Sequence, residues 1–363
     1  LLIFKPILSF CPMQFKIKKS FIIYLIITTF TFHNNLYSNS KTYNIEDFGI
    51  ISLMYHRFEE NKYPSTNIKI EDFIKHINIL EKDDVNFVNP NNFENELRNN
   101  KSQRKVLLTI DDGFLSFYKN AWPILKKKKI PFILFVSTRE VGTFGYMTWD
   151  QIRELNNEKF VEIGNHSHTH EYLVEENKKT IIADIENSIR IFRNELGKNS
   201  NFFSYPFGEY SLEFKEIIKS LGFKYAFGQH SGVMDETKDL YELPRYPINE
   251  KYGEIKRFKS LIKTLPFKFT NITPDEKYLL QNKNPPKVKI VFNKNIKNLK
   301  SLNCYSNEGN RWRQSNIKFE DDITLHINVK EKFIGERGRI NCSLRDPSGF
   351  WRWLGIQFVI SDK

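Results

Sequence analysis

Apolar runs and amphipathic segments alternate along residues 48–250. In the segment 68–83, apolar residues recur at helical spacing, and a second helical segment, 177–197, closes at Gly197. Strands that alternate with helices in this way are typical of βα units around a mainly parallel sheet. We therefore predict an α/β domain whose strands lie in these apolar runs: 48–58, 104–114, 131–137, 160–170, 202–211, 223–229 and 240–248.

The pattern changes after Pro285 and Pro286, where short alternating runs replace the helical segments. We predict a barrel domain at 41–270, a linker at 271–284 and a small C-terminal all-β, sandwich-like domain at 285–363. Trp312, Trp351 and Trp353 recur among arginines in this tail. Two interpretations stay open for them: indoles that form the core of the sandwich, or aromatic faces that stack on sugar rings. The strands predicted in the tail are 287–292, 323–329, 339–346 and 353–360.

Residues 1–40 read as a leader. Residues 1–12 precede Met13 and are interpreted as an upstream extension of the reading frame. Three lysines at 16–19 then precede a mainly apolar run of twelve residues, 21–32, whereas a membrane-spanning helix needs about 20. Ser38 and Ser40 place small residues at a cleavage site. We predict a signal peptide and export to the periplasm, the cell surface or the medium, with membrane contact only if the leader is not cleaved.

The formal charge of +12 does not indicate nucleic-acid binding, because the lysines are spread along an exported chain instead of forming an aromatic-studded basic face. Cys304 and Cys342 remain after the leader. A disulfide between them and two reduced core cysteines are both consistent with their spacing.

Polar clusters follow several of the predicted strands, at the edge where parallel α/β sheets bind ligands. "DDG" occupies 111–113, and "HSHTH" places three of the eight histidines within 166–170. A turn and a polar surface loop are the alternative interpretations. Taken together, however, Asp112, His166 and His170 offer the three ligands of a catalytic zinc-like site with an open position. Asp111 would then stand beside the ion as a general base for an attacking water.

These motifs resemble the polysaccharide deacetylases of carbohydrate esterase family four. "TIDDG", 109–113, is similar to the family's Thr-Phe-Asp-Asp-Gly, with Ile110 in place of Phe, and "HSHTH" matches its histidine motif. The resemblance implies a distorted (β/α)7-type barrel, Asp111 as base, and Asp112, His166 and His170 as ligands. The implied cofactor is a divalent metal: zinc, with cobalt or nickel as alternatives.

A third family motif resembles "SYPFG", 204–208, without the arginine that usually precedes it. The resemblance implies that the substrate groove is lined by Tyr205, Pro206, Phe207 and Gly208, and that the Phe207 N–H helps hold the oxyanion. Arg245, in "LPRYPI", is the candidate to complete this substrate side and to orient Asp111, since guanidinium pairs well with carboxylate. An ion pair with a surface acid is its alternative role.

The family's late Leu-x-His motif, which carries a general acid, is missing. "LMYHRF", 53–58, together with "YPFG", resembles the subgroup that deacetylates poly-N-acetylglucosamine exopolysaccharides, in which the acid comes from the first strand. We therefore predict His56 as the acid, with a hydrogen bond to a neighbouring loop as the alternative. The resemblance covers about residues 48–250.

The predicted protein is a hydrolase that uses metal-activated water to remove N-acetyl groups from a β-linked N-acetylhexosamine polysaccharide. An O-acetyl polysaccharide esterase is the alternative with the same chemistry, and a non-catalytic glycan-binding protein on a deacetylase barrel is the alternative without it. A base beside a metal is unnecessary for binding alone, so the set of Asp111 and the three ligands favours an enzyme. Its expected partner is acetylated polysaccharide, and no nucleic acid.

Overall fold

A computed structural model describes residues 48–99 and 102–361 of the chain. The leader predicted at 1–40 lies outside the described residues. No helix in the described part of the chain is both long and apolar enough to cross a membrane.

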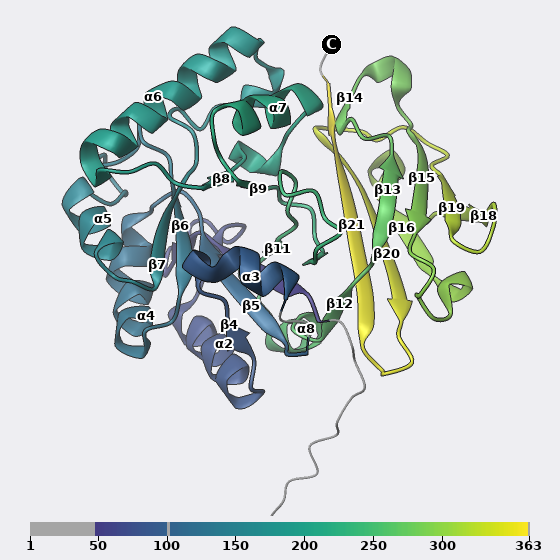
Figure 1. Ribbon diagram of the computed structural model, residues 1–363, viewed down its shortest axis with the longest axis horizontal. Coiled ribbons are helices and arrows are strands. Elements are labelled where there is room, and N and C mark those ends of the chain that lie inside the picture. Colours follow the sequence, from purple (N-terminus) through teal and green to yellow (C-terminus); the bar gives the residue numbers. More distant parts are fainter. Residues whose placement is uncertain (1–47, 100–101, 362–363) are drawn as a thin grey trace, which may run out of the picture. The chain divides into compact units, whose positions relative to one another are not determined.

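A curled sheet of mostly parallel strands forms the barrel domain (Figure 1). From β1 the neighbours run in the order β5, β6, β7, β8 and β9, and β11 pairs with the other side of β1. Leu243 also bridges in parallel to Phe227 of β9, so the segment 243–247 joins the last strand of the series to the first. The predicted distorted barrel is confirmed.

The parallel strands are β1 (Ile50–Tyr55), β5 (Lys105–Ile110), β6 (Phe132–Val136), β7 (Val161–Asn165), β8 (Phe202–Ser204), β9 (Tyr225–Phe227) and β11 (Tyr246–Pro247). Two minor strands, β4 (Asn86–Phe87) and β10 (Val233–Met234), flank them, and β2 (Arg57–Phe58) pairs separately with β3 (Asn67–Ile68).

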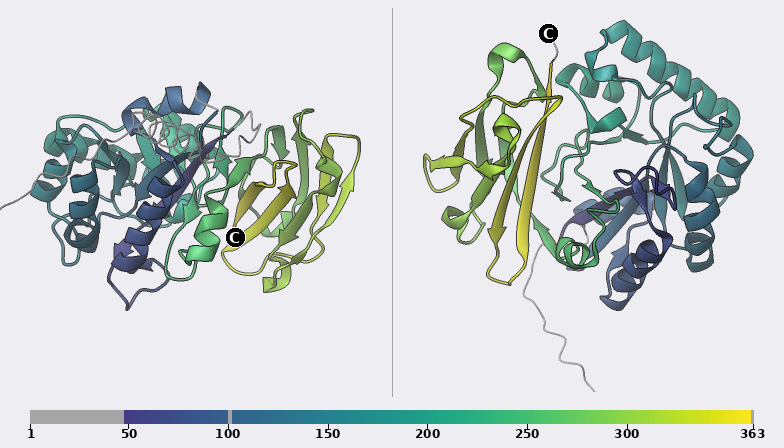
Figure 2. Two further views of the ribbon diagram at one scale, coloured as in Figure 1. Left: turned by 90° about the horizontal axis from the view of Figure 1, so that it is seen from below. Right: turned by 180° about the vertical axis from the view of Figure 1, so that it is seen from behind.

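Helices cover the outer side of this sheet (Figures 1 and 2). Their ends follow local chemistry: Thr148 forms a capping box with Gln151 at α5, Asn177 caps α6, and Gly197 ends α6 with φ 70°. The predicted helices 68–83 and 177–197 are confirmed as α2 and α6. The helices are α2 (Ile70–Lys82), α3 (Phe93–Arg98), α4 (Trp122–Lys128), which continues a π-helical turn (Phe117–Ala121), α5 (Trp149–Asn156), α6 (Lys178–Leu196), α7 (Leu212–Ser220) and α8 (Ile255–Leu261).

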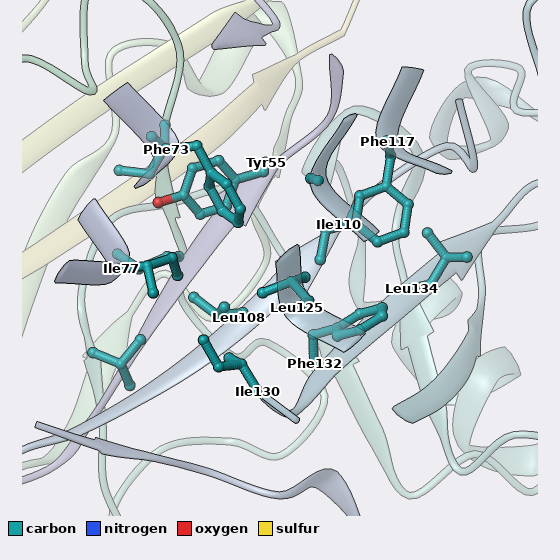
Figure 3. Close-up of a cluster of buried hydrophobic side chains, with 14 of the residues drawn as sticks. Tyr55, Phe73, Ile77, Leu108, Ile110, Phe117, Leu125, Ile130, Phe132 and Leu134 are labelled. Carbon is teal, nitrogen blue, oxygen red and sulfur yellow. The ribbon is translucent and has the colours of Figure 1, made fainter. Parts of the chain in front are cut away.

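The strand that carries the aspartate motif is buried on both faces. All six residues of β5 are buried, and Leu108 and Ile110 pack with side chains of α2, α4 and β6 (Figure 3). Burial of one such aliphatic side chain stabilises the fold by about 1.5–3 kcal/mol. This packing fixes the position at which β5 ends, and hence the position of the two aspartates that follow it.

Two sheets form the C-terminal β-domain, residues 264–361, as the predicted sandwich-like domain requires (Figure 2). Alternate side chains of β20 and β21, including Ile340 and Ile356, share a core with Ile290 of the opposite sheet. Cys304 and Cys342 lie opposite each other on β16 and β20 and form a disulfide. One sheet contains β12 (Thr264–Pro266), β14 (Tyr278–Leu279), β16 (Asn303–Ser306), β17 (Arg313–Gln314), β20 (Arg337–Arg345) and β21 (Trp351–Ile360); the other contains β13 (Phe269–Thr273), β15 (Lys287–Phe292), β18 (Asn316–Phe319) and β19 (Thr324–Asn328).

The structure corrects two expectations about this tail. Residues 271–284, predicted as a linker, contain the end of β13 and all of β14, which pair with β15 and β21. Such short strands have no local periodicity, because their partners lie far along the chain. The tryptophans do not form the core of the sandwich: Trp312 and Trp351 are 54% and 47% exposed, and Trp353 packs partly buried against the barrel core.

The barrel domain and the β-domain belong to one compact unit, Ile45–Lys363. The Trp353 indole donates to Ser231 Oγ at 2.8 Å, and Arg337 Nε donates to Glu209 Oε1 at 2.5 Å. Gly355 N–H also donates to the Ser231 carbonyl. The β-domain therefore lies against loops that follow β8 and β9.

Candidate metal and catalytic site

Three sequence motifs meet at the carboxyl edge of the barrel. Asp111 follows β5, and its N–H donates to the Tyr55 carbonyl of β1 at 2.9 Å. His56 comes directly after Tyr55, while His166 directly follows β7 and donates its backbone N–H to the Val136 carbonyl of β6. The parallel register thus brings together residues that the sequence separates widely.

Asp112, His166 and His170 form a compact group of metal-ligand atoms. One atom from each lies within 4.8 Å of the others. The Asp112 Oδ1 atom is 3.3 Å from Nε2 of His166 and 3.4 Å from Nε2 of His170. Two imidazoles and a carboxylate are the ligand types that zinc and similar ions use, and three ligands leave a position open.

The hydrogen bond of the His166 ring is consistent with a cation site at these residues. Its Nδ1–H donates to the Ser204 carbonyl at 2.7 Å, so the lone pair of a neutral ring lies on Nε2 and faces Asp112. The Asp112 Oδ1 atom is buried and accepts no hydrogen bond within the described part of the chain. A carboxylate oxygen and imidazole lone pairs that converge in this way are stable when a cation lies between them.

Strained backbone holds the ligand loops. Non-glycine residues with positive φ include Asp112 at 75°, Ser167 at 69° and His170 at 54°. Left-handed conformations are uncommon for non-glycine residues and are found in clusters at functional sites. The His170 N–H is in turn held by Ser167 Oγ at 3.0 Å.

Asp184 of α6 anchors the histidine loop from behind. Its carboxylate accepts the backbone N–H groups of His168 at 2.8 Å and Thr169 at 3.1 Å. Sequence reasoning missed Asp184, because a single acid inside an amphipathic helix gives no local signal. The His168 ring lies outside the ligand group, since its Nδ1 is hydrogen bonded to Thr138 Oγ1 at 2.8 Å.

Asp111 forms a buried two-point ion pair with Arg245. Nη1 and Nη2 of Arg245 donate to the two carboxylate oxygens at 2.7 and 2.8 Å, and both side chains are fully buried. Burial raises the pKa of Asp111, but the charges of Arg245 and the nearby histidines outweigh that effect and hold the pKa below its ordinary value. Asp111 is therefore ionised, as a general base must be.

All three guanidinium nitrogen atoms of Arg245 are hydrogen bonded within the protein, so the side chain does not line the substrate groove. Its Nε donates to the Gly228 carbonyl at 3.0 Å, and Nη2 also donates to Ser204 Oγ at 2.8 Å. The prediction that Arg245 lines the groove is wrong, and so is the alternative of a surface ion pair. Ser204, the first residue of the "SYPFG" motif, connects this arginine with the His166 ring.

His56 lies close to the same group of charges. It is half-buried and interacts electrostatically with Asp111, Asp112 and His170. Since β1 lies between β5 and β11 in the sheet, the residue after its last position borders both the aspartates and the Arg245 segment.

The "YPFG" segment presents one of its four side chains to the site. Tyr205 is fully buried in a hydrophobic cluster and donates its hydroxyl to the Tyr241 carbonyl, so its predicted place in the groove is wrong. Pro206 and Gly208 are buried as well. Half-buried Phe207, at φ 58°, lies 4.8 Å from the His170 ring and stacks at 4.0 Å on Tyr172, a 42% exposed residue that sequence reasoning missed.

The sequence comparisons agree with this geometry. The family model described as polysaccharide deacetylase matches residues 98–226. A poly-beta-1,6-N-acetyl-D-glucosamine N-deacetylase of Staphylococcus aureus (strain MRSA252) is 30% identical over 171 residues, which cover 43% of this chain and 59% of that protein. The match therefore spans less than two thirds of the length of this curated relative.

Solved structures are similar over more than half of the chain. The structure of IcaB from Ammonifex degensii has a TM-score of 0.55 and 26% identity, and the match covers 60% of this chain and 98% of that one. The Streptococcus pyogenes deacetylase PplD, solved in complex with acetate, has a TM-score of 0.52 and 23% identity, covering 56% of this chain and 94% of that one. At this lower identity the second likeness supports the fold alone.

Proposed function

We propose that the chain, whose residues 98–226 match the polysaccharide deacetylase family model, is a metal-dependent N-deacetylase of an acetylated polysaccharide. The observation that carries the proposal is the buried Asp111–Arg245 pair beside the group of Asp112, His166 and His170. The name of the S. aureus relative favours poly-β-1,6-N-acetyl-D-glucosamine as the polymer, a β-linked N-acetylhexosamine.

Asp112, His166 and His170 would hold the divalent cation, with zinc expected before cobalt or nickel because their nitrogen and oxygen ligands suit it. When bound, such an ion supplies positive charge that polarises the acetyl carbonyl and makes water more acidic. Within the chain, the Ser204 carbonyl keeps the His166 lone pair directed to this position.

Asp111 takes a proton from the attacking water, whose oxygen forms the new bond to the acetyl carbon. Arg245 keeps the carboxylate ionised and fixes the direction of its oxygens, so that the base needs no rearrangement before it acts. The Phe207 N–H is proposed to stabilise the negative charge that develops on the acetyl oxygen. His56 gives a proton to the sugar nitrogen as the carbon–nitrogen bond breaks, which leaves acetate and a free amine.

Export is part of the proposal, and it rests on the leader pattern in residues 13–40, outside the described residues. An acetylated polymer of the cell surface or its surroundings is then the partner, and the chain offers no feature that favours nucleic acid.

Neither alternative function is favoured. Ester cleavage needs less help from an acid than amide cleavage, whereas a candidate acid, the half-buried His56, lies close to the charges of the site. A binding protein without activity would have no use for an ionised carboxylate fixed beside a ligand group.

Release of acetate tests the proposal directly. The purified protein, stripped of metal and then supplied with zinc, cobalt or nickel, is incubated with N-acetylated and O-acetylated glycans. We expect metal-dependent acetate release from β-1,6-linked N-acetylglucosamine oligomers. Release from O-acetylated glycans alone would indicate an esterase, and none from any glycan would contradict the proposal.

A further inference from the structure

A cavity of about 530 Å³ opens between the barrel domain and the β-domain. Barrel loops supply one wall, including Gln229 and Tyr252, and the strands β20 and β21 supply the other through Arg339 and Trp353. Its size is that of a ligand site, which typically measures 300–1,000 Å³.

The cavity borders the proposed active site. Gln229 packs so tightly against the "YPFG" segment that a Cβ added to Gly208 would meet its side chain at 2.2 Å. Pro247, also in the wall, pairs with Met54 of β1, two residues before His56. Two residues of the cavity wall are therefore neighbours of segments that carry the proposed active site.

Aromatic side chains line the cavity. Trp312 is 54% exposed and Tyr252 is 41% exposed, so both rings are accessible to a ligand. The Trp353 ring is oriented by its hydrogen bond to Ser231. Aromatic rings offer flat apolar faces to the C–H faces of sugars at little cost in conformational entropy.

The charge of the lining is purely positive. Arg257 and Arg339 contribute two guanidinium groups, and none of the described residues in the wall is Asp or Glu. Arg339 Nε donates to the uncharged amide of Gln357, and Arg257 lies 5.0 Å over the Tyr252 ring. The nearby carboxylate of Glu209 is bound by Arg337.

His230 adds no charge to this wall. Burial lowers its pKa to about 3, and the nearby lysines and arginines act in the same direction, so the ring is neutral at pH 7. The positive charge of the wall therefore comes from Arg257 and Arg339.

We propose that this cavity binds stretches of the polysaccharide that are still acetylated and rejects stretches that are already deacetylated. An N-acetyl group is uncharged, whereas the free amine that replaces it is cationic at pH 7 and lies near two uncompensated guanidinium groups. The inference rests on the proposed function, because it assumes a polymer whose amines are freed. Its consequence is that the enzyme releases finished stretches and returns to unprocessed ones.

Binding to two matched oligosaccharides tests the proposal. A β-1,6-linked N-acetylglucosamine hexamer and the same hexamer with free amines are immobilised. Association of the full-length protein is followed by interferometry at pH 7, before acetate release becomes detectable. We expect the acetylated hexamer to bind about 10-fold more tightly or better, as one unscreened charge contact near a protein surface would give.

Matched variants distinguish binding in the cavity from binding at the proposed catalytic site, where acetyl groups are also expected to bind. Arg339→Gln should shrink the preference, whereas Arg345→Gln, on the same strand but outside the cavity, should not. Trp312→Ala should weaken binding of the acetylated hexamer, and Trp351→Ala, a similarly exposed indole outside this cavity, is its control. Thermal unfolding followed by circular dichroism verifies that each variant is folded, and Arg257→Gln replaces Arg339→Gln if that variant is not.

The outcomes distinguish this inference from the proposed function. If acetate is released but Arg339→Gln and Trp312→Ala bind both hexamers as the unchanged protein does, the cavity proposal is overturned and the deacetylase proposal stands. If the unchanged protein shows the preference, and these variants lose it, while no metal supports acetate release, the binding cavity stands and the deacetylase proposal fails.

Discussion

Arg245 holds both carboxylate oxygens of Asp111, at 2.7 and 2.8 Å, across 134 positions of the sequence. The pair lies at the place where the barrel closes, because Arg245 stands between Leu243, bridged to β9, and Tyr246, paired with β1. The segment that closes the barrel therefore also positions the arginine that orients the proposed base.

Replacement of Asp111 by Asn should preserve metal binding and lower turnover by a factor of at least ~100, the lower range for the loss of a general base. The matched variant is Asp112→Asn, which should lose the metal because Asp112 belongs to the ligand group. Metal content by mass spectrometry and acetate release measure the two effects. If Asp111→Asn loses the metal and Asp112→Asn keeps it, the two roles are reversed.

Arg245→Lys should lower kcat by about 10²-fold with little change in KM or metal content. An ammonium group cannot hold two carboxylate oxygens at once, and a base displaced by about 1 Å loses that much in rate. Arg245→Met should instead destabilise the fold by ~3–5 kcal/mol, because it leaves Asp111 buried without its partner. A rise in KM alone for Arg245→Lys would indicate a substrate contact, against the burial seen here.

His56→Ala should slow hydrolysis of an N-acetyl amide much more than hydrolysis of an activated aryl acetate. The amine leaves poorly unless it is protonated, whereas an aryl oxide needs no proton. The ratio of the two kcat/KM values, compared with that of the unchanged protein, is the measurement. Equal losses on both substrates would remove His56 as the acid.

Acid should destabilise the fold through His76. Burial lowers its pKa to about 4 against an ordinary value of 6.5, and the neutral ring donates to the Gly253 carbonyl while it accepts from the Tyr55 hydroxyl. Between pH 4 and pH 6.5 the unfolded chain binds more protons than the folded chain does. The stabilisation from the neutral ring is therefore fully present above pH 6.5 and is lost as the pH falls toward 4. The loss amounts to about 3 kcal/mol.

Urea unfolding at pH 7.5, 5.5 and 4.5 measures this effect. His76→Gln, which keeps a donor for the Gly253 carbonyl but does not titrate, is the matched variant. Its free energy of unfolding should depend less on pH than that of the unchanged protein. Parallel pH dependences of the two would exclude His76 as the cause.

The sequence by itself determined the class of the fold and the residues at the ends of its strands. Hydrophobic periodicity is local, so it located α2 and α6 and the order of βα units. The spacing of "DDG" and "HSHTH" likewise placed Asp112, His166 and His170 behind β5 and β7, since a strand end and a following loop are adjacent along the chain. The parallel sheet then brought these ends to one edge.

Tertiary structure decided which side chains point inward and which distant residues pair. Tyr205 lies within the motif but turns into a hydrophobic cluster, and Arg245 reaches Asp111 only through the register of the closing segment. Asp184 holds the histidine loop from a helix, and short strands occupy the predicted linker. None of these features has a local pattern, because each depends on contacts between segments that the sequence separates and only the folded chain brings together.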